Sequence, residues 1–318
     1  MNETINPRPV ISAVIPAYNE SQGIETTIKQ VADILTGCVN GDWEIIVVDD
    51  GSNDDTYQQV CALSQLDTRI KGIALSRNFG KEGALLAGLA HATGAAILTL
   101  DADRQHPPIF IPDMIAKWQA GADIVHAVKR SRTQDSVGQK AAAYCVNHLI
   151  SGLGGIDVKN SSDFKLLDRK IVNIIVYQLP EKQRFFRGLT SWIGFNEDYI
   201  YFDVAEREGD ESKWSFLSLL ELAITALISF TCAPLRIVTF LGVLTLVLGF
   251  GVASEALWSL INNQTVSGYN TIIICVLLLG SFIMISLGII GEYVAKIYDE
   301  VKARPHYLVK NSVGIDDN

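Results

Sequence analysis

The sequence predicts an α/β domain with a mostly parallel sheet, followed by an amphipathic helix and two transmembrane helices. Short apolar runs alternate with helical patterns through residues 9–128, which is typical of βαβ units. Each of the first four runs ends in a polar cluster. Residues 237–254 and 271–291 contain no charged side chain, and a bilayer core needs about 20 helical residues.

The expected strands are short apolar runs bounded by Gly, Pro or polar residues, as buried strands are. They are residues 9–15, 43–48, 70–75, 95–100, 123–128 and 199–204. Ser21 is a candidate cap for a helix to about Leu35, a second helix begins near Asp54, and a third ends near Ala92. A further helix is expected at 139–150. Right-handed connections bring the carboxyl ends of such strands to one edge of the sheet.

Asp101 and Asp103 directly follow the fourth expected strand. In an extended segment residues i and i+2 point the same way, so both carboxylates can face one point. Open α/β sheets hold their ligands at this end of the strands. Two carboxylates so close raise each other's pKa unless a cation lies between them, which favours Mg²⁺ or Mn²⁺ with a diphosphate. A solvated acidic turn is the alternative.

Polar clusters at the ends of all four of these strands together favour a nucleotide site at this edge. The clusters are Tyr18-Asn19-Glu20, Asp49-Asp50, Ser76-Arg77-Asn78 and Asp101-Ala102-Asp103. Asp49 or Asp50 could bind uracil or ribose hydroxyls, with Lys81 near the diphosphate. The alternative for Asp49 and Asp50 is a tight turn, and the alternative for Lys81 is a lysine exposed to solvent. The sequence has no G-x-G-x-x-G and no Walker loop, which disfavours dinucleotide and P-loop chemistry.

Composition narrows the function class. The net charge of −9 gives no electrostatic support for nucleic-acid binding. The five cysteines are scattered without a C-x-x-C pair, which indicates reduced thiols in a reducing compartment. The first residues lack the basic and apolar pattern of a signal sequence.

Two polar segments beyond the fifth strand contain further candidates. Arg130 and Arg132 lie in a polar loop and could meet an anion, although a solvated basic loop has the same pattern. Asp157 and Asp163 could be site carboxylates, and a helix cap or turn role is equally compatible with their positions.

The composition changes near Trp214. An apolar stripe predicts an amphipathic helix at 213–233 on a membrane surface, then transmembrane helices at 235–261 and 269–292. The connector between them has no Lys or Arg, whereas cations flank the pair, so both flanks are expected in the cytoplasm. The domain 1–212 would then work in the cytosol against the plasma (inner) membrane. The cytosolic tail 293–318 is expected to pack loosely or to mediate contacts in a homo-oligomer.

Several of these segments resemble glycosyltransferase family 2, in its polyprenyl-phosphate branch. They are residues 14–20 (Val-Ile-Pro-Ala-Tyr-Asn-Glu), 47–52 (Val-Val-Asp-Asp-Gly-Ser) and 101–108 (Asp-Ala-Asp-Arg-Gln-His-Pro-Pro). Residues 184–188 (Arg-Phe-Phe-Arg-Gly) and 206–214 are similar to the same branch. That branch includes dolichyl-phosphate mannose synthases and bactoprenol glucosyltransferases, and the latter are the nearest likeness. The resemblance extends through the two expected transmembrane helices.

The resemblance implies a GT-A fold, a nucleotide-sugar donor, a divalent metal (Mg²⁺ or Mn²⁺) and inversion at the anomeric carbon. By position, it assigns the donor nucleotide to Pro16, Ala17, Tyr18, Glu20, Asp49, Ser76, Asn78, Lys81 and Asp101. It assigns the metal and diphosphate to Asp101, Asp103 and Gln105.

The predicted reaction is transfer of one hexose, glucose from UDP-glucose, to undecaprenyl phosphate or a similar lipid. Candidates to hold the acceptor phosphate are Arg130, Arg132, Arg207 and Lys213. The catalytic candidates are Asp103 and Asp157, the latter as a base or orienting carboxylate, with a structural role left open. The alternatives are GDP-mannose or a UDP-aminosugar as donor, and a non-catalytic membrane-anchored subunit that binds nucleotide sugars.

Overall fold

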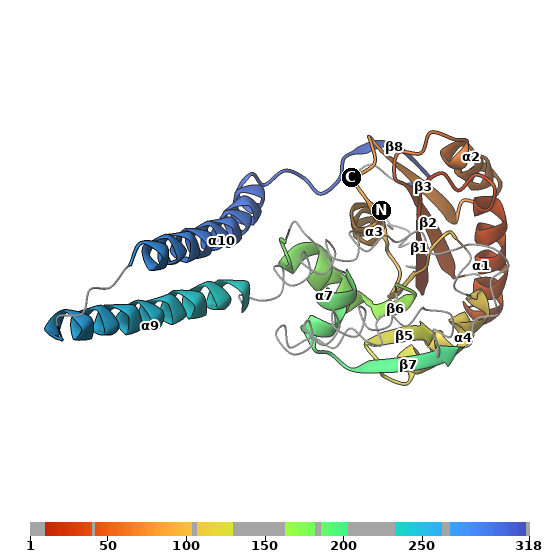
Figure 1. The fold of residues 1–318 in the computed structure, drawn as a ribbon. Helices are drawn as coiled ribbons and strands as arrows, with labels where there is room; N and C mark the ends of the chain where they lie inside the picture. Colours follow the sequence, from red (N-terminus) through yellow and green to blue (C-terminus); the bar gives the residue numbers. More distant parts are fainter. Residues whose placement is uncertain are drawn as a thin grey trace, which may run out of the picture. The chain divides into compact units, whose positions relative to one another are not determined.

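The computed structural model describes residues 10–39, 42–103, 107–129, 163–181, 186–202, 233–262 and 268–315 (Figure 1). They belong to two compact units. The first unit contains the described residues up to 202 and, from the other end of the chain, residues 304–315. The second contains the described residues of 233–303.

The first unit is built on a sheet that has eight strands among the described residues, in the order β7-β5-β6-β4-β1-β2-β3-β8. The strands are β1 (Ile11–Ala17), β2 (Trp43–Asp49), β3 (Ile70–Leu75), β4 (Ala96–Thr99), β5 (Ile124–Lys129), β6 (Lys165–Asp168), β7 (Glu197–Phe202) and β8 (Val309–Val313). β4, β1, β2 and β3 are parallel, as are β5 and β7, whereas β6 and β8 run antiparallel to their neighbours. The predicted GT-A-like α/β sheet, mostly parallel, is confirmed.

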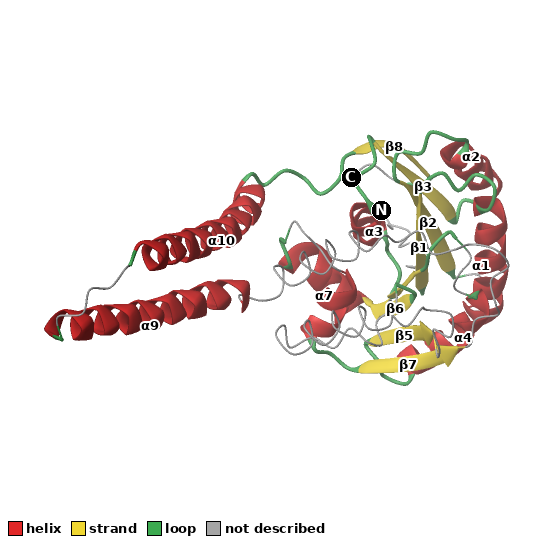
Figure 2. Cartoon of the chain, viewed as in Figure 1, coloured by secondary structure: helices red, strands yellow, loops and turns green. Residues whose placement is uncertain are grey.

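Helices cover both faces of this sheet and give the unit three layers (Figure 2). One face is covered by α1 (Ile24–Val39), α2 (Thr56–Leu66) and α4 (Ile111–Gln119). The other is covered by α3 (Lys81–His91), α6 (Arg169–Asn173) and α7 (Phe186–Ile193). The short helical turns η1 (Pro108–Phe110) and η2 (Ile174–Gln178) precede α4 and follow α6.

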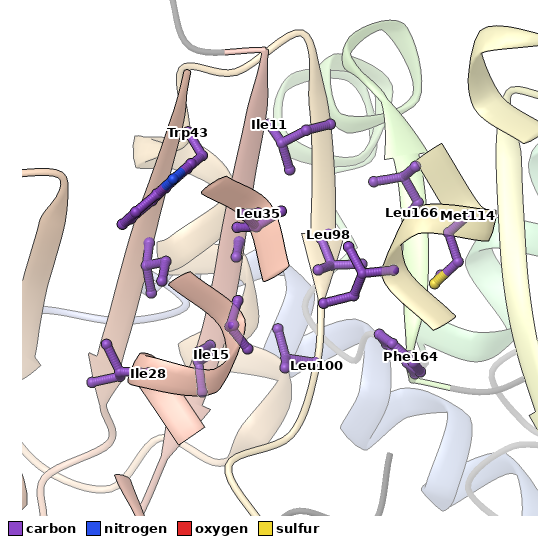
Figure 3. Packing of buried hydrophobic residues seen from close by; sticks show 14 of the residues in the cluster. Ile11, Ile15, Ile28, Leu35, Trp43, Leu98, Leu100, Met114, Phe164 and Leu166 are labelled. Carbon is purple, nitrogen blue, oxygen red and sulfur yellow. The ribbon is translucent and has the colours of Figure 1, made fainter. Parts of the chain in front are cut away.

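The alternation of side chains in β1 divides the core into two clusters. Ile11 and Ile15 pack under α1 (Figure 3). Val14 packs on the opposite face, under α3. On α1, Ile28 and Leu35 face the sheet because buried residues recur there at intervals of three and four. Buried residues on both faces make the four parallel strands read as continuous apolar runs, and their chain direction brings their polar ends to one edge.

Two strands differ from the sequence prediction. β6 is not predicted, because it is short and contains the charged Lys165 in place of a continuous apolar run. The prediction of a loosely packed tail at 293–318 is wrong at residues 309–313, which form β8 along β3. The tail also begins later than expected, because the preceding helix continues to Val301.

The second unit consists of two long helices that contact each other, α9 (Ala233–Ile261) and α10 (Tyr269–Val301). Within the described residues, Leu278–Val301 is the segment long and apolar enough to cross a membrane, and Phe240–Val252 is a shorter apolar stretch. The helix predicted at 139–150 and residues 213–232 of the helix predicted at 213–233 lie outside the described residues.

Candidate functional site

The carboxyl ends of β1, β2, β3 and β4 border two adjoining cavities. We name them the Asp101 cavity, of about 330 Å³, and the Asp49 cavity, of about 590 Å³. They meet at Tyr18 and Asn78, which line both. The predicted residues on the Asp101 cavity are Pro16, Ala17, Tyr18, Glu20, Asn78, Lys81, Asp101 and Asp103, and those on the Asp49 cavity are Tyr18, Asp49, Ser76 and Asn78. The structure therefore brings the described donor-site candidates together at one edge.

Adjacent carboxylates at the end of β2 both accept backbone hydrogen bonds and line different cavities, Asp50 the Asp101 cavity and Asp49 the Asp49 cavity. Asp50 accepts hydrogen bonds from the backbone N–H groups of Phe79 at 2.7 Å and Gly80 at 2.9 Å. These bonds fix the turn before α3, whose first residue is Lys81. Asp49 lines the Asp49 cavity. Burial raises the pKa of both carboxyls, so keeping them charged in the folded chain costs free energy.

The loops after β1 and β2 are tied together. The backbone N–H of Asn19 donates to Ser52 Oγ at 2.8 Å, and that of Asn53 donates to Asn19 Oδ1 at 2.9 Å. Gly51 has a φ of +71°, and a Cβ there would lie 2.5 Å from the backbone carbonyl carbon of Arg77. This position therefore requires glycine, which lets the second and third strand ends approach.

Lys81 and Arg187 flank a carboxylate beside the Asp101 cavity. Lys81 Nζ lies 2.6 Å from Asp101 Oδ1 and 2.7 Å from Asp163 Oδ2. Arg187 donates to both Asp163 oxygens, from Nε at 2.7 Å and Nη2 at 2.6 Å. Burial alone would raise the pKa of Asp163, but Arg187 and Lys81 outweigh it and hold that pKa well below its usual range. Partial burial lowers the pKa of Lys81, yet its two carboxylate neighbours produce a net rise.

Two more titratable groups lie behind this cluster. Lys165 is fully buried, donates a hydrogen bond to Thr190, and has its Nζ 5.1 Å from the ring centroid of Phe186. Burial lowers the pKa of Lys165 to about 7 and raises the pKa of Glu82 to about 7. Glu82 Oε1 accepts from the backbone N–H of Phe186 at 3.3 Å. These contacts fix the start of α7, which carries Arg187.

Two polar cavities at the carboxyl ends of parallel strands set the context for comparison with known proteins. Residues 12–172 match the pattern of Glycosyl transferase family 2. The chain belongs to this family. It is 39% identical over 308 residues to an uncharacterized glycosyltransferase, sll0501, of Synechocystis sp., covering 96% of each chain. It is 38% identical to the putative glycosyltransferase CsbB of Bacillus subtilis, covering 95% of this chain and 92% of CsbB. It is 36% identical to the SfII prophage-derived bactoprenol glucosyl transferase of Shigella flexneri, covering 95% of this chain and 98% of that protein.

The donor set of this family 2 chain suits a hard divalent cation. Asp101 and Asp103 both line the Asp101 cavity and offer carboxylate oxygens. Among the described residues, no group of three or more His, Cys, Asp or Glu gathers as a metal site. Mg²⁺ is commonly bound through one or two carboxylates together with substrate phosphates and water, which fits these two residues.

The remaining predicted residues of the family 2 site lie outside the described part of the chain. They are Gln105, Arg130, Arg132, Asp157, Arg207 and Lys213. The acceptor-phosphate site, the third metal ligand and the role of Asp157 therefore stay predictions.

Sequence reasoning assigned no role to three residues that the fold brings to the site: Arg187, Lys310 and Asn311. Arg187 had a signal, because it belongs to the segment Arg-Phe-Phe-Arg-Gly that resembles the family. Lys310 and Asn311 line the Asp49 cavity, but no sequence signal marked them, because they follow the long apolar helices in the chain.

Proposed function

We propose that this chain transfers a single glucose from UDP-glucose to a polyprenyl phosphate, with inversion at the anomeric carbon. The observation that carries the proposal is its similarity to proteins named bactoprenol glucosyl transferase. The Shigella flexneri protein is matched over 95% of this chain, far beyond residues 12–172. The similarity therefore includes the long apolar helices as well as the α/β unit. Undecaprenyl phosphate is the acceptor that this likeness favours.

The two adjoining cavities suit the two parts of a nucleotide sugar. The Asp49 cavity would receive the nucleoside, with Asp49 toward ribose or base and Ser76 beside it. The Asp101 cavity would receive the diphosphate, near Lys81. Tyr18 and Asn78, which line both, would lie where the two parts join.

Charge compensation for the leaving nucleotide would come from two sources. A divalent cation held by Asp101, Asp103 and Gln105 would offset negative charge on the departing diphosphate. Lys81, fixed between Asp101 and Asp163, would add a second positive charge at the same place. The ion pairs preorganise this lysine, so little rearrangement is needed when charge develops.

The acceptor needs orientation more than activation. A phosphomonoester has a second pKa near 6, so the lipid phosphate is largely dianionic at neutral pH and is already nucleophilic. Arg130, Arg132, Arg207 and Lys213 are proposed to hold it. Asp157 is proposed as a base or as the carboxylate that orients the acceptor.

The helices α9 and α10 are proposed to anchor the enzyme as two transmembrane helices, with both termini in the cytoplasm. Phe240, Phe250 and Met284 are exposed on these helices, as apolar side chains in contact with lipid are. An anchored enzyme meets its lipid acceptor at the membrane surface.

Two alternatives remain to be separated from this proposal. The same reaction could use GDP-mannose or a UDP-aminosugar, because donor choice depends on the shape of the pocket. The other alternative is a non-catalytic membrane-anchored subunit that binds nucleotide sugars, and the paired carboxylates and Lys81 favour catalysis over it.

The deciding experiment is transfer of radiolabel from UDP-glucose to undecaprenyl phosphate in detergent, with Mg²⁺ or Mn²⁺ and with EDTA. We expect labelled lipid that disappears with EDTA. Product from another donor alone would replace glucose in the proposal. Donor binding without product from any nucleotide sugar would favour the non-catalytic subunit.

A further inference from the structure

The C-terminal strand β8 brings two polar residues to the wall of the Asp49 cavity. Lys310 and Asn311 line this cavity together with Asp49 and Ser76. Neither residue lines the Asp101 cavity, where the diphosphate is proposed to bind. The cavity for the nucleoside is thus completed by a strand from the opposite end of the chain.

Contacts along β3 hold β8 in place. The backbone N–H of Ser76 donates to the carbonyl of Leu308 at 2.8 Å, where β3 ends. Tyr307 packs against the apolar cluster under α3. Val313 lies opposite Gly72, where a Cβ would lie 2.9 Å from Val313 Cγ1, so glycine permits the close approach of the two strands. The wall formed by β8 is therefore a fixed part of the first unit.

A β-bulge explains how two consecutive residues of one strand can both line the same cavity. Asn311 lies opposite Ala74 and Val309 opposite Leu75, so Lys310 is the extra residue between them. Neighbours in a regular strand point to opposite faces, whereas a bulge bends the strand and re-aims a side chain. Lys310 and Asn311 are both exposed, so core packing does not explain this arrangement.

The chemistry of the two side chains matches a nucleoside. The Asn311 amide offers two donors and an acceptor, which complement the alternating carbonyl and N–H groups of a nucleobase edge. The Lys310 ammonium brings a donor to a cavity that also contains the carboxylates of Asp49 and Asp54. Acidic groups suit ribose hydroxyls, and the ammonium suits a base carbonyl.

We propose that Lys310 and Asn311 bind the nucleoside of the donor, so that donor recognition depends on the strand that follows the membrane helices. The inference rests on the proposed function, because it takes the donor to be a nucleotide sugar.

The test is the dissociation constant of UDP, with GDP for the alternative donor, measured by calorimetry on the full chain in detergent. Lys310→Ala and Asn311→Ala should each weaken binding about tenfold, the size expected for one hydrogen bond that involves a charged or well-placed polar group. Lys310→Arg should retain most of the affinity. Lys302→Ala is the matched control, because Lys302 is an exposed lysine of the same C-terminal region that does not line the cavity.

Binding of inorganic pyrophosphate with Mg²⁺ distinguishes the contribution of the nucleoside to affinity from that of the diphosphate. Unchanged pyrophosphate affinity in the two alanine variants supports the proposal, whereas an equal loss for pyrophosphate and UDP overturns it. UDP and GDP affinities equal to wild type in well-folded variants also overturn it. Thermal melting of each variant identifies a loss of binding that is due to misfolding.

Lipid transfer distinguishes this inference from the proposed function. Wild-type protein that transfers sugar while both alanine variants bind donor normally contradicts the inference alone. Wild-type protein that binds UDP through Lys310 and Asn311 but yields no lipid product from any donor contradicts the function alone.

Discussion

The parallel strands β4, β1, β2 and β3 carry polar residues at both ends and use them in opposite ways. At their amino ends, Ser12 Oγ donates to Glu44 Oε1 at 2.5 Å, and Lys71 Nζ donates to Glu44 Oε2 at 2.6 Å. The backbone N–H of Thr93, just before β4, donates to Glu44 Oε1 at 2.6 Å. At their carboxyl ends, by contrast, polar side chains border cavities of about 330 and 590 Å³.

Glu44 illustrates how a buried carboxylate is stabilised. It is only 3% exposed, and burial alone would raise its pKa, but its hydrogen bonds and the charge of Lys71 produce a net decrease. Gly94 N–H donates to Ser12 Oγ at 2.7 Å and joins the start of β4 to the network. This network satisfies its own polar groups.

At the carboxyl ends Asp163 is compensated by Arg187 and Lys81, but three other carboxyls lack such full compensation. Burial leaves the pKa of Asp49, Asp50 and Glu82 raised, so the folded state disfavours their charged forms. Groups with perturbed pKa values gather at functional sites. The amino ends of the strands therefore stabilise the fold, whereas the raised pKa values at the carboxyl ends lower stability, as is common at binding sites. Substitutions at each end should separate activity from stability.

The largest expected effect is on transfer, at the carboxyl ends. Asp103→Asn should lower kcat/KM about a thousandfold, because it removes a charge proposed to hold the cation opposite the leaving diphosphate. The melting temperature should not fall, since Asp103 is exposed. Label transfer from UDP-glucose and thermal melting of the same preparation measure both. Full activity in this variant would contradict the proposal that the reaction takes place at the Asp101 cavity.

The next effect is on stability, at the amino ends. Glu44→Gln should lower the free energy of unfolding by about 3 kcal/mol, because it removes one partner of a buried ion pair and leaves Lys71 without its counter-charge. Transfer by the remaining folded protein should be unchanged. Denaturant unfolding in detergent, with activity per folded molecule, checks this. A loss of kcat with unchanged stability would contradict the division between the two ends.

A smaller effect is expected beside the Asp101 cavity. Asp163→Asn should lower kcat/KM about thirtyfold, because Lys81 and Arg187 lose the carboxylate that fixes them. Asp198→Asn is the matched control, since Asp198 pairs with Lys117 at 2.8 Å and lines neither cavity. Kinetics of both variants against UDP-glucose measure the difference. Equal activity of the two variants would assign Asp163 a purely structural role.

The carboxyl ends were predictable because their signals are local. The apolar runs that become β1 to β4 are continuous in the sequence, and each is followed directly by its polar cluster. The adjacency of Asp101 and Asp103 was sufficient to place both on one cavity. Parallel connections then determine that these clusters meet.

Features that depend on pairing between distant segments were not predictable. β6 contains a buried lysine, so no apolar run marks it, and its place between β4 and β5 depends on both neighbours. The sequence of β8 has no apolar strand pattern, and its strand conformation depends on pairing with β3. Glu44 and Lys71 likewise lie in separate strands, and only their register brings them together.

The smallest expected effect is the pH dependence of a carboxyl at the site. The pKa of Glu82 rises from 4.5 to about 7 by burial, so the folded chain binds this proton more tightly than the unfolded chain between those values. Its contribution to stability is therefore present below about pH 4.5 and lost as the pH rises through about 7. Glu82→Gln keeps an oxygen for the backbone N–H of Phe186 and removes the charge. Relative to wild type, its gain in the free energy of unfolding should be larger at pH 8 than at pH 5, by at least about 1 kcal/mol, measured by denaturant unfolding at both values. An equal effect at both pH values would mean that Glu82 is already ionised in the fold, and the contrast between the two ends of the strands would then rest on Asp49 and Asp50 alone.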